Sequence, residues 1–293
     1  MSINTPIRLI AMDMDGTLLL PHTTPGPRIS DNCLRALREA DRAGIHLAIA
    51  SGRMPDDASF FARDMGLPMH ILSLNGGCIQ MEPLGEITDS FPMRPETAAR
   101  LWQTAKRPGL ILGMFAGHEL TISIPLQDEN LFWWGTHLMR QGSRCRLHGN
   151  GEAAEKLTEK GVHKLVVQAE NDAALGTLAA LRTELLQTMP EVEITSSWYS
   201  NIEINPKGCN KGSALCALAE RLHIPMTEVM AIGDNGNDVP MLTAVGYGVA
   251  MGNATETAIA SSGWQTLSNE QDGVAIAIRE LVLKMGNGQV KRL

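Results

Sequence analysis

Short apolar runs of strand length alternate with helical patterns along this chain. In the helical stretches, apolar residues return to one face at intervals of three and four. Strands that alternate with helices pair in parallel, since each helix carries the chain back across the sheet. We therefore expect an α/β, Rossmann-like core with a central parallel sheet, whose strands lie at residues 8–12, 45–50, 70–73, 229–232 and 247–251.

Two of the expected helices carry clear boundary signals. One covers residues 30–43, where Ser30 or Asp31 can cap its first turn. Another covers residues 55–65 and ends at Gly66, a residue that suits the C-terminus of a helix.

The pattern changes in the middle of the chain, where a hairpin-like segment at residues 78–89 is followed by half-polar strands. A length of 293 residues corresponds to about two domains. We expect a core domain of residues 1–82 and 203–293, and an inserted α/β cap domain of residues 83–202. The cap should hold an antiparallel sheet covered by helices, with strands at residues 110–115, 119–124, 164–168 and 192–195 and helices at 96–106, 128–140 and 173–189.

Composition argues against several classes of function. The formal net charge is −7 and no run rich in Lys or Arg occurs, which argues against nucleic acid as a partner. The chain lacks both the apolar stretch of about 18 residues that a membrane span needs and a signal-peptide pattern at its start. We expect a cytoplasmic protein without membrane contact, a monomer or small homo-oligomer. No C-x-x-C pair occurs, and we expect buried thiols at Cys33, Cys78, Cys145, Cys209 and Cys216.

Two acidic residues follow the first apolar run, in the sequence Asp13-Met14-Asp15-Gly16-Thr17. A central strand of a parallel sheet ends at the crevice where ligands bind, so both carboxylates are candidates for a site. Gly16 permits the turn that would bring the two carboxylates together. The alternative interpretation is a solvated turn that closes a strand.

A second acidic segment follows the run at residues 229–232, with the sequence Gly233-Asp234-Asn235-Gly236-Asn237-Asp238. If the two strand ends are neighbours, four carboxylates share one crevice. Two like charges about 4 Å apart repel by about 4 kcal/mol at an effective dielectric constant of about 20, so the group needs a cation. Oxygen ligands on loops suit Mg²⁺ better than zinc. The alternative is a Gly/Asn-rich loop without a ligand.

Ser51 and Lys211 supply the opposite chemistry. Ser51 follows the run at residues 45–50, and Lys211 opens a helix that Asn210 can cap. A hydroxyl, an ammonium group and free helix N–H groups together form a seat for phosphate. The alternatives are a turn serine and a surface lysine. Arg53 could also reach a ligand, although a surface ion pair is the simpler role.

Other segments fit a site less well. Residues 208–213 lack the ordered spacing of a phosphate-binding loop, and residues 246–252 lack that of a dinucleotide fingerprint. The aromatic run at 132–134 favours a packed helix face over a substrate wall. Selectivity would lie in cap residues facing the core, for which the candidates are Trp133, Trp134, His118 and Arg140.

Taken in order, four motifs resemble those of the haloacid dehalogenase (HAD) superfamily, and of its Cof-type phosphatases (subclass IIB) most closely. The resemblance covers nearly the whole chain. It extends to the insertion between the second and third motifs and to the segments at 205–212, 250–254 and 272–274. The motifs are Asp13-x-Asp15-Gly16-Thr17, Ser51-Gly52-Arg53, Lys211, and Gly233-Asp234-x-x-Asn237-Asp238.

The resemblance implies a HAD-type core with an α/β cap, Mg²⁺ as cofactor, and a role for each motif. Asp13 would be the nucleophile that forms an aspartyl-phosphate, and Asp15 would protonate the leaving oxygen and then activate water. Ser51 and Lys211 would hold the phosphoryl oxygens. The metal ligands would be Asp13, the main-chain carbonyl of Asp15, and Asp234, with support from Asn237 and Asp238. Substrate contacts are expected from Asn75, Gly76 and Arg53.

We therefore expect a Mg²⁺-dependent phosphatase of small phosphorylated metabolites, such as sugar or cofactor-precursor phosphates. A carboxylate nucleophile divides the hydrolysis into two easier steps. Three alternatives remain at this point: a phosphomutase of the same superfamily, a sugar-phosphate-binding protein without turnover, and a receiver-like signalling protein. The last is usually shorter and needs no cap.

Overall fold

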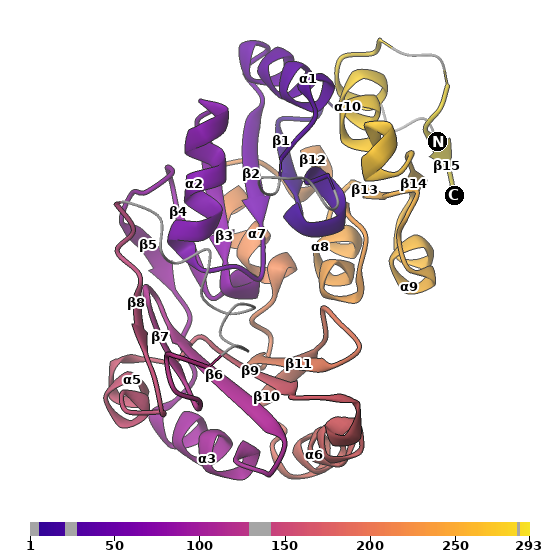
Figure 1. The fold of residues 1–293 in the computed structure, drawn as a ribbon. Helices are drawn as coiled ribbons and strands as arrows, with labels where there is room; N and C mark the ends of the chain where they lie inside the picture. Colours follow the sequence, from indigo (N-terminus) through magenta and orange to yellow (C-terminus); the bar gives the residue numbers. More distant parts are fainter. Residues whose placement is uncertain (1–5, 21–27, 129–141, 286–287) are drawn as a thin grey trace.

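The computed structural model describes residues 6–20, 28–128, 142–285 and 288–293. The chain forms two sheets, each covered by helices, and the two bodies lie one above the other in Figure 1. The central part of the chain builds the lower body, which we call the cap. The segments on either side of it in the sequence build the upper body, which we call the core.

The core sheet has nine strands in the order β15-β14-β13-β12-β1-β2-β3-β4-β5. The six strands from β14 to β3 run parallel, as the alternation of strands and helices predicts, and the strands at the two edges are antiparallel. The strands are β1 (Leu9–Met12), β2 (His46–Ala50), β3 (Met69–Ser73), β4 (Cys78–Gln80), β5 (Ile87–Ser90), β12 (Val229–Gly233), β13 (Tyr247–Ala250), β14 (Trp264–Gln265) and β15 (Lys291–Arg292).

Helices cover both faces of the core sheet. Alternate residues of β1 face opposite ways, so Ile10 packs with the first group of helices and Leu9 with the second. The first group is α1 (Asp31–Arg42), α2 (Pro55–Met65) and α10 (Gly273–Ala277), and the second is α7 (Lys211–Arg221), α8 (Val239–Ala244) and α9 (Glu256–Ala260).

The expected boundary signals of the first two helices are confirmed. The hydroxyl of Ser30 accepts a hydrogen bond from the backbone N–H of Cys33 at 3.0 Å and so caps α1. Helix α2 starts with Pro55 and ends at Gly66, whose φ of 65° is left-handed. Helix α1 therefore begins, and helix α2 ends, where local chemistry favours it.

The cap sheet has six strands in the order β10-β11-β9-β6-β7-β8, and only the β7–β8 pair among these is parallel. Three helices cover one face of it. The strands are β6 (Leu110–Ala116), β7 (Glu119–Ile122), β8 (Arg146–His148), β9 (Lys164–Ala169), β10 (Val192–Thr195) and β11 (Asn201–Pro206), and the helices are α3 (Pro95–Ala105), α5 (Ala154–Lys160) and α6 (Leu175–Thr188).

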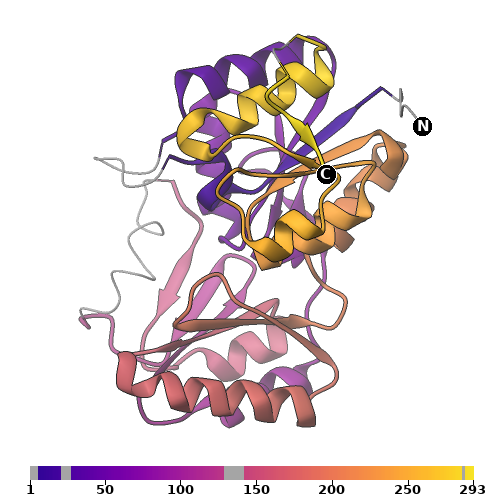
Figure 2. The same ribbon diagram turned by 90° about the vertical axis from the view of Figure 1, so that its right-hand side faces the viewer.

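The other face of the cap sheet packs against the core. Ile111 and Phe115 of β6 form one apolar cluster with Met54 and Leu74, which belong to loops at the ends of core strands. Figure 2 shows the cap sheet below the core, with the three cap helices on the side of the sheet that faces away from the core. The cap therefore covers the carboxyl ends of the parallel strands.

The structure departs from the sequence-based expectations at a few places. The hairpin at residues 78–89 exists, but its strands β4 and β5 extend the core sheet, while β11 of the cap sheet runs to Pro206. Division of the chain into domains at residues 83 and 203 stays a prediction. The helix expected at 128–140 lies outside the described residues, except for residue 128.

Cys145 is half-buried and Cys216 is exposed, so the expectation of buried thiols is wrong for these two. Within the described ranges, no helix has the length and apolarity to cross a membrane.

Candidate active site

Three strands of the core sheet end side by side and bring distant residues together. β1 lies between β2 and β12 and pairs in parallel with both. Asp13 follows β1 directly, and its backbone N–H donates to the carbonyl of Ile232 at 3.0 Å. Ser51 follows β2, and Asp234 follows β12. The predicted convergence of the acidic segments is therefore present.

The chain turns immediately after Asp13. Gly16 has a left-handed φ of 87°, and a Cβ atom at this position would lie 2.4 Å from Oδ2 of Asp234. Glycine is required here because the Asp234 carboxylate occupies the space that a side chain would need. The hydroxyl of Thr17 donates to Oδ1 of Asp234 at 2.7 Å. The turn thus orients a carboxylate that is more than 200 residues away in sequence.

Three carboxylates meet at this point. Asp13, Asp234 and Asp238 each offer an oxygen, and these oxygens lie within 4.8 Å of one another. Burial raises the pKa of Asp13 well above its ordinary value; Lys211 opposes the shift, and the neighbouring carboxylates add to it. Burial, followed by the charge of Asp238, raises the pKa of Asp234 to about 6. The cluster resists full ionisation, and its oxygen donors fit a hard cation such as Mg²⁺.

Asp238 holds the second acidic loop in shape. Its Oδ2 accepts from the backbone N–H groups of Asp234 at 2.9 Å and Asn235 at 3.0 Å. Its Oδ1 accepts from Lys211 at 2.6 Å. Asn237, in the same loop, lies in the wall of the cavity described below. Both oxygens of Asp238 therefore have partners, and these contacts tie the loop after β12 to Lys211.

Lys211 begins α7 and is fully buried. The side chain of Asn210 accepts from the backbone N–H of Ser213 at 3.0 Å, which confirms the expected cap. The Lys211 Nζ atom donates to Asp13 at 2.5 Å and to Asp238 at 2.6 Å. Burial alone would lower the pKa of Lys211, but these two carboxylates outweigh it and raise that pKa. The alternative of a surface lysine is therefore wrong.

Arg53 turns into the site and holds Asp15. The hydroxyl of Ser51 accepts from the backbone N–H of Arg53 at 3.2 Å. The guanidinium of Arg53 donates to the two oxygens of Asp15 at 2.6 and 2.8 Å, and to Asp57 at 3.0 Å. Burial lowers the pKa of Arg53, but Asp15 and Asp57 outweigh it and raise that pKa. The ion pair considered for Arg53 thus exists, and its partner is Asp15, the second aspartate of the first motif.

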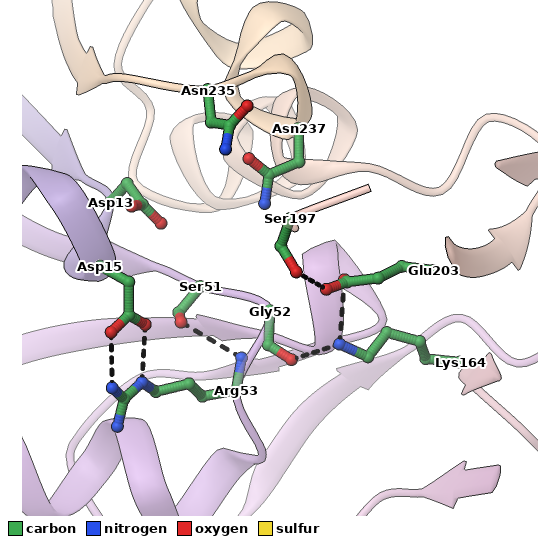
Figure 3. Close-up of a pocket in the computed structure, with 10 residues that line it drawn as sticks. All are labelled: Asp13, Asp15, Ser51, Gly52, Arg53, Lys164, Ser197, Glu203, Asn235 and Asn237. Carbon is green, nitrogen blue, oxygen red and sulfur yellow. Dashed lines mark hydrogen bonds and ion pairs between the residues drawn. The ribbon is translucent and has the colours of Figure 1, made fainter. Parts of the chain in front are cut away.

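A cavity of about 240 Å³ lies between the core and the cap, and Lys211, Asp234 and Asp238 are not among the described residues that line it. Figure 3 shows Asp13 and Asp15 on one side of it and residues of the cap on the other. The core contributes Asp13, Asp15, Ser51, Gly52, Arg53, Asn235 and Asn237, and the cap contributes Lys164, Ser197 and Glu203.

The three cap residues were not predicted. Lys164 and Glu203 are single charged residues in otherwise apolar or uncharged strand patterns, and Ser197 lies in a polar loop. A charged residue on a strand face that should be buried was the available signal. Which face each strand presents depends on the sheet register, however, and local sequence does not reveal that.

Asn75 and Gly76, which we predicted to contact substrate, lie behind the cavity wall. Asn75 is buried, and its Nδ2 donates to Glu203 at 2.5 Å. A Cβ atom at Gly76 would lie 2.3 Å from the carbonyl oxygen of Asn210. Neither is among the described residues that line the cavity. A role for them as substrate ligands stays a prediction.

A second group of possible metal ligands, Asp56, His118 and Cys145, joins α2 to the cap. The Arg144 backbone N–H donates to one oxygen of Asp56 at 2.5 Å, and its guanidinium donates to the other at 2.9 Å. Burial raises the pKa of Asp56, but hydrogen bonds from His118 and Arg144 outweigh it and lower that pKa. The positive charge of the Arg144 guanidinium on Asp56 disfavours the binding of a metal ion to the same carboxylate. His118 is therefore part of this contact, and the other cap candidates, Trp133, Trp134 and Arg140, lie outside the described residues.

Comparison with known proteins agrees with this geometry. A model of the haloacid dehalogenase-like hydrolase family matches residues 10–278. The 5-amino-6-(5-phospho-D-ribitylamino)uracil phosphatase of Bacillus subtilis is 30% identical over 94% of this chain and 96% of its own. A solved haloacid dehalogenase-like hydrolase from Bacteroides thetaiotaomicron is 27% identical, with a TM-score of 0.76 over 94% of this chain and 99% of that one. A solved HAD subclass IIB sugar phosphatase, 21% identical, shares the fold with a TM-score of 0.77 over 94% of this chain and 98% of that one.

Proposed function

The chain belongs to the haloacid dehalogenase-like hydrolases, and we propose that it is a Cof-type phosphatase of subclass IIB that hydrolyses small phosphomonoesters with Mg²⁺ through an aspartyl-phosphate on Asp13. The observation that carries the proposal is the position of Asp13. Its carboxylate lies at the end of the central strand, in the wall of the cavity, between a buried ammonium group and two further carboxylates.

In the first step, an oxygen of Asp13 attacks the phosphorus atom and the bond to the leaving oxygen breaks. Asp15 gives its proton to that oxygen, so an alcohol leaves and an aspartyl-phosphate remains. In the present structure both oxygens of Asp15 accept hydrogen bonds from Arg53, so the step requires that this pair separates and that Asp15 takes up a proton from solvent before the substrate reacts. In the second step, Asp15 takes a proton from water, which attacks phosphorus and releases phosphate from Asp13.

Lys211 and Ser51 hold the phosphoryl oxygens in this proposal. Lys211 is anchored by Asp13 and Asp238, so its ammonium group is fixed before substrate arrives. Fixed positive charge at the phosphoryl oxygens lowers the barrier to transfer without a cost of reorganisation. Ser51 is buried at the end of β2 and is one of the residues that line the cavity.

Asp13, Asp234 and the main-chain carbonyl of Asp15 would hold Mg²⁺, with Asn237 and Asp238 in support. The raised pKa values of Asp13 and Asp234 favour this assignment, because burial and the neighbouring carboxylates disfavour their charged forms and a bound cation would offset both effects. When bound, the ion supplies positive charge to the transferring phosphoryl group. The hydrogen bond from Thr17 and the close approach of Gly16 support a fixed orientation of the Asp234 carboxylate.

The substrate would be a small phosphorylated metabolite, because the cap roofs the cavity and leaves about 240 Å³. The name of the Bacillus subtilis relative includes a phosphorylated ribityl chain on an aminouracil. Sugar phosphates and phosphorylated cofactor precursors of similar size are therefore our first candidates.

Phosphate release from p-nitrophenyl phosphate by the purified protein, with and without Mg²⁺, tests the proposal. We expect steady release that depends on the metal and falls below about a hundredth of its rate in Asp13→Asn, which lacks the nucleophile but keeps the shape of the side chain. Isomerisation of a sugar phosphate without free phosphate would instead indicate a phosphomutase. Activity of Asp13→Asn above that level would assign the nucleophile elsewhere.

A further inference from the structure

The cap places a buried ion pair in the wall of the cavity, opposite the two motif aspartates (Figure 3). The pair consists of Lys164 at the start of β9 and Glu203 in β11, with Nζ 3.1 Å from Oε2. Their side chains are 5% and 8% exposed. Removal of two charges from water costs free energy, and a buried ion pair often adds little to stability. The presence of this pair therefore points to a role in the cavity or in the contact between cap and core.

The neighbours of the pair fix both side chains. Lys164 also donates to the carbonyl of Gly52 at 2.7 Å, directly after Ser51, to which we assign phosphate binding. Glu203 accepts from Ser197 at 2.5 Å and from Asn75 at 2.5 Å. The pair is thus held between the core loop that follows β2 and the cap loop that carries Ser197.

Hydrogen-bonding capacity remains after these contacts are counted. An ammonium group has three donors and a carboxylate about four acceptor sites. Contacts with described residues use two donors of Lys164 and three acceptor sites of Glu203. One donor of Lys164 and one acceptor site of Glu203 therefore remain, and both residues line the cavity, which suits a hydroxyl or an amide group.

The charge of this end of the cavity is balanced. Burial raises the pKa of Glu203, but Lys164 and the hydrogen bonds from Ser197 and Asn75 outweigh it and lower that pKa, so Glu203 carries its charge. Lys164 is already neutralised by this partner. A second anionic group on a substrate would meet the Glu203 carboxylate, and a hydrocarbon group would leave the pair without its remaining hydrogen bonds.

We propose that Lys164 and Glu203 determine specificity: they admit phosphomonoesters whose alcohol part is uncharged and carries hydroxyl or amide groups, and Glu203 rejects those with a second anionic group. This inference rests on the proposed phosphatase function and names the substrate class of the same site.

Two six-carbon phosphates test it, because they differ only at the carbon farthest from the phosphate. Glucitol 6-phosphate has a hydroxymethyl group there, and 6-phosphogluconate has a carboxylate. Competition of each against p-nitrophenyl phosphate gives their relative kcat/KM. We expect the wild type to favour glucitol 6-phosphate by about tenfold or more, and we expect Glu203→Gln to reduce that ratio by about tenfold.

The matched control is Glu119→Gln. Glu119 is also a buried, ion-paired glutamate of the cap sheet, but it is not among the described residues lining the cavity. Its loss should leave the ratio unchanged. A merely structural effect of Glu203→Gln would lower kcat/KM for both compounds and leave their ratio as in the wild type, and this result would overturn the proposal.

If Glu203→Gln fails to fold, the ratio of the two kcat/KM values in the wild type still tests the proposal. A ratio near one, a preference for 6-phosphogluconate, or the failure of either compound to compete while p-nitrophenyl phosphate is hydrolysed would each contradict the specificity assignment. The absence of phosphate from all three compounds would contradict the proposed function itself, so the two failures are distinguishable.

Discussion

Lys211 and Asp13 form an ion pair inside the protein, with Nζ 2.5 Å from Oδ1 and side chains that are 0% and 8% exposed. The two residues are 198 positions apart in the sequence. The helix that starts at Lys211 therefore supplies the positive charge for a carboxylate at the end of β1. Stability and chemistry of the site depend on the same contact.

Replacement of Lys211 by Met should destabilise the metal-free protein strongly at pH 7. Asp13 and Asp238 would lose their buried cation, and loss of one partner from a buried ion pair costs about 3 to 5 kcal/mol in the free energy of unfolding. Urea denaturation measures this change. Lys160→Met is the control, because Lys160 is half-exposed and its pair with Glu119 should contribute about 1 kcal/mol or less. Equal losses in the two variants would contradict the electrostatic account.

Magnesium should stabilise the protein more as the pH rises. The pKa of Asp234 is raised from 3.8 to about 6 in the folded protein, so the folded state binds this proton more tightly than the unfolded chain does. The metal-free protein should therefore lose stability as the pH rises from about 4 to about 6. Mg²⁺ requires the deprotonated carboxylate, so the increase in melting temperature on adding Mg²⁺ should be small at low pH and should grow through this range. A shift independent of pH would argue against Asp234 as a ligand.

Gly16→Ala should abolish the stabilisation of the protein by Mg²⁺. The new Cβ would lie 2.4 Å from Oδ2 of Asp234 and would displace that carboxylate. Gly44→Ala is a matched control: Gly44 has a similar φ of 80° but nothing within 4 Å of a Cβ. Both variants should lose about 1 kcal/mol of stability to backbone strain. Only Gly16→Ala should also lose phosphatase activity and the Mg²⁺-dependent increase in melting temperature, which scanning fluorimetry measures.

Arg144→Ala should weaken the contact between the cap and α2. The Asp56 side chain is fully buried and would lose its guanidinium partner, at a cost of about 3 kcal/mol in the free energy of unfolding. The lowered pKa of Asp56 means that this contact stabilises the protein above pH 3.8 and is lost as the pH falls below that value. The variant should therefore be less stable at pH 7 but lose less on acidification. Arg63→Ala, which breaks an exposed pair with Asp64, should change stability little.

The sequence was sufficient where local chemistry decides the structure. Apolar runs predict the parallel strands, and Ser30 and Asn210 mark helix starts that the structure confirms. The acidic segments could be placed together because parallel strands end at one edge of a sheet. For the same reason Asp13 and Asp234 were predictable, although the turn that brings them together depends on Gly16.

The cap side of the cavity could not be predicted, because it depends on tertiary structure. Lys164 and Glu203 meet through the antiparallel register of β9 and β11, which places Glu203 opposite Val166. Arg144 finds Asp56 across 88 residues of sequence. A single charge in a strand pattern hints at a buried role for Lys164 and Glu203, but local sequence does not identify the partner in either pair.

Trapping of the covalent intermediate tests the central claim most directly. Asp15→Asn cannot activate water efficiently, so phosphate should remain on the protein after it is mixed with Mg²⁺ and p-nitrophenyl phosphate. Borohydride reduction of the quenched protein, followed by peptide mass spectrometry, should then show homoserine at position 13. Homoserine at another aspartate, or unmodified Asp13 in a sample that still releases p-nitrophenol, would contradict the account.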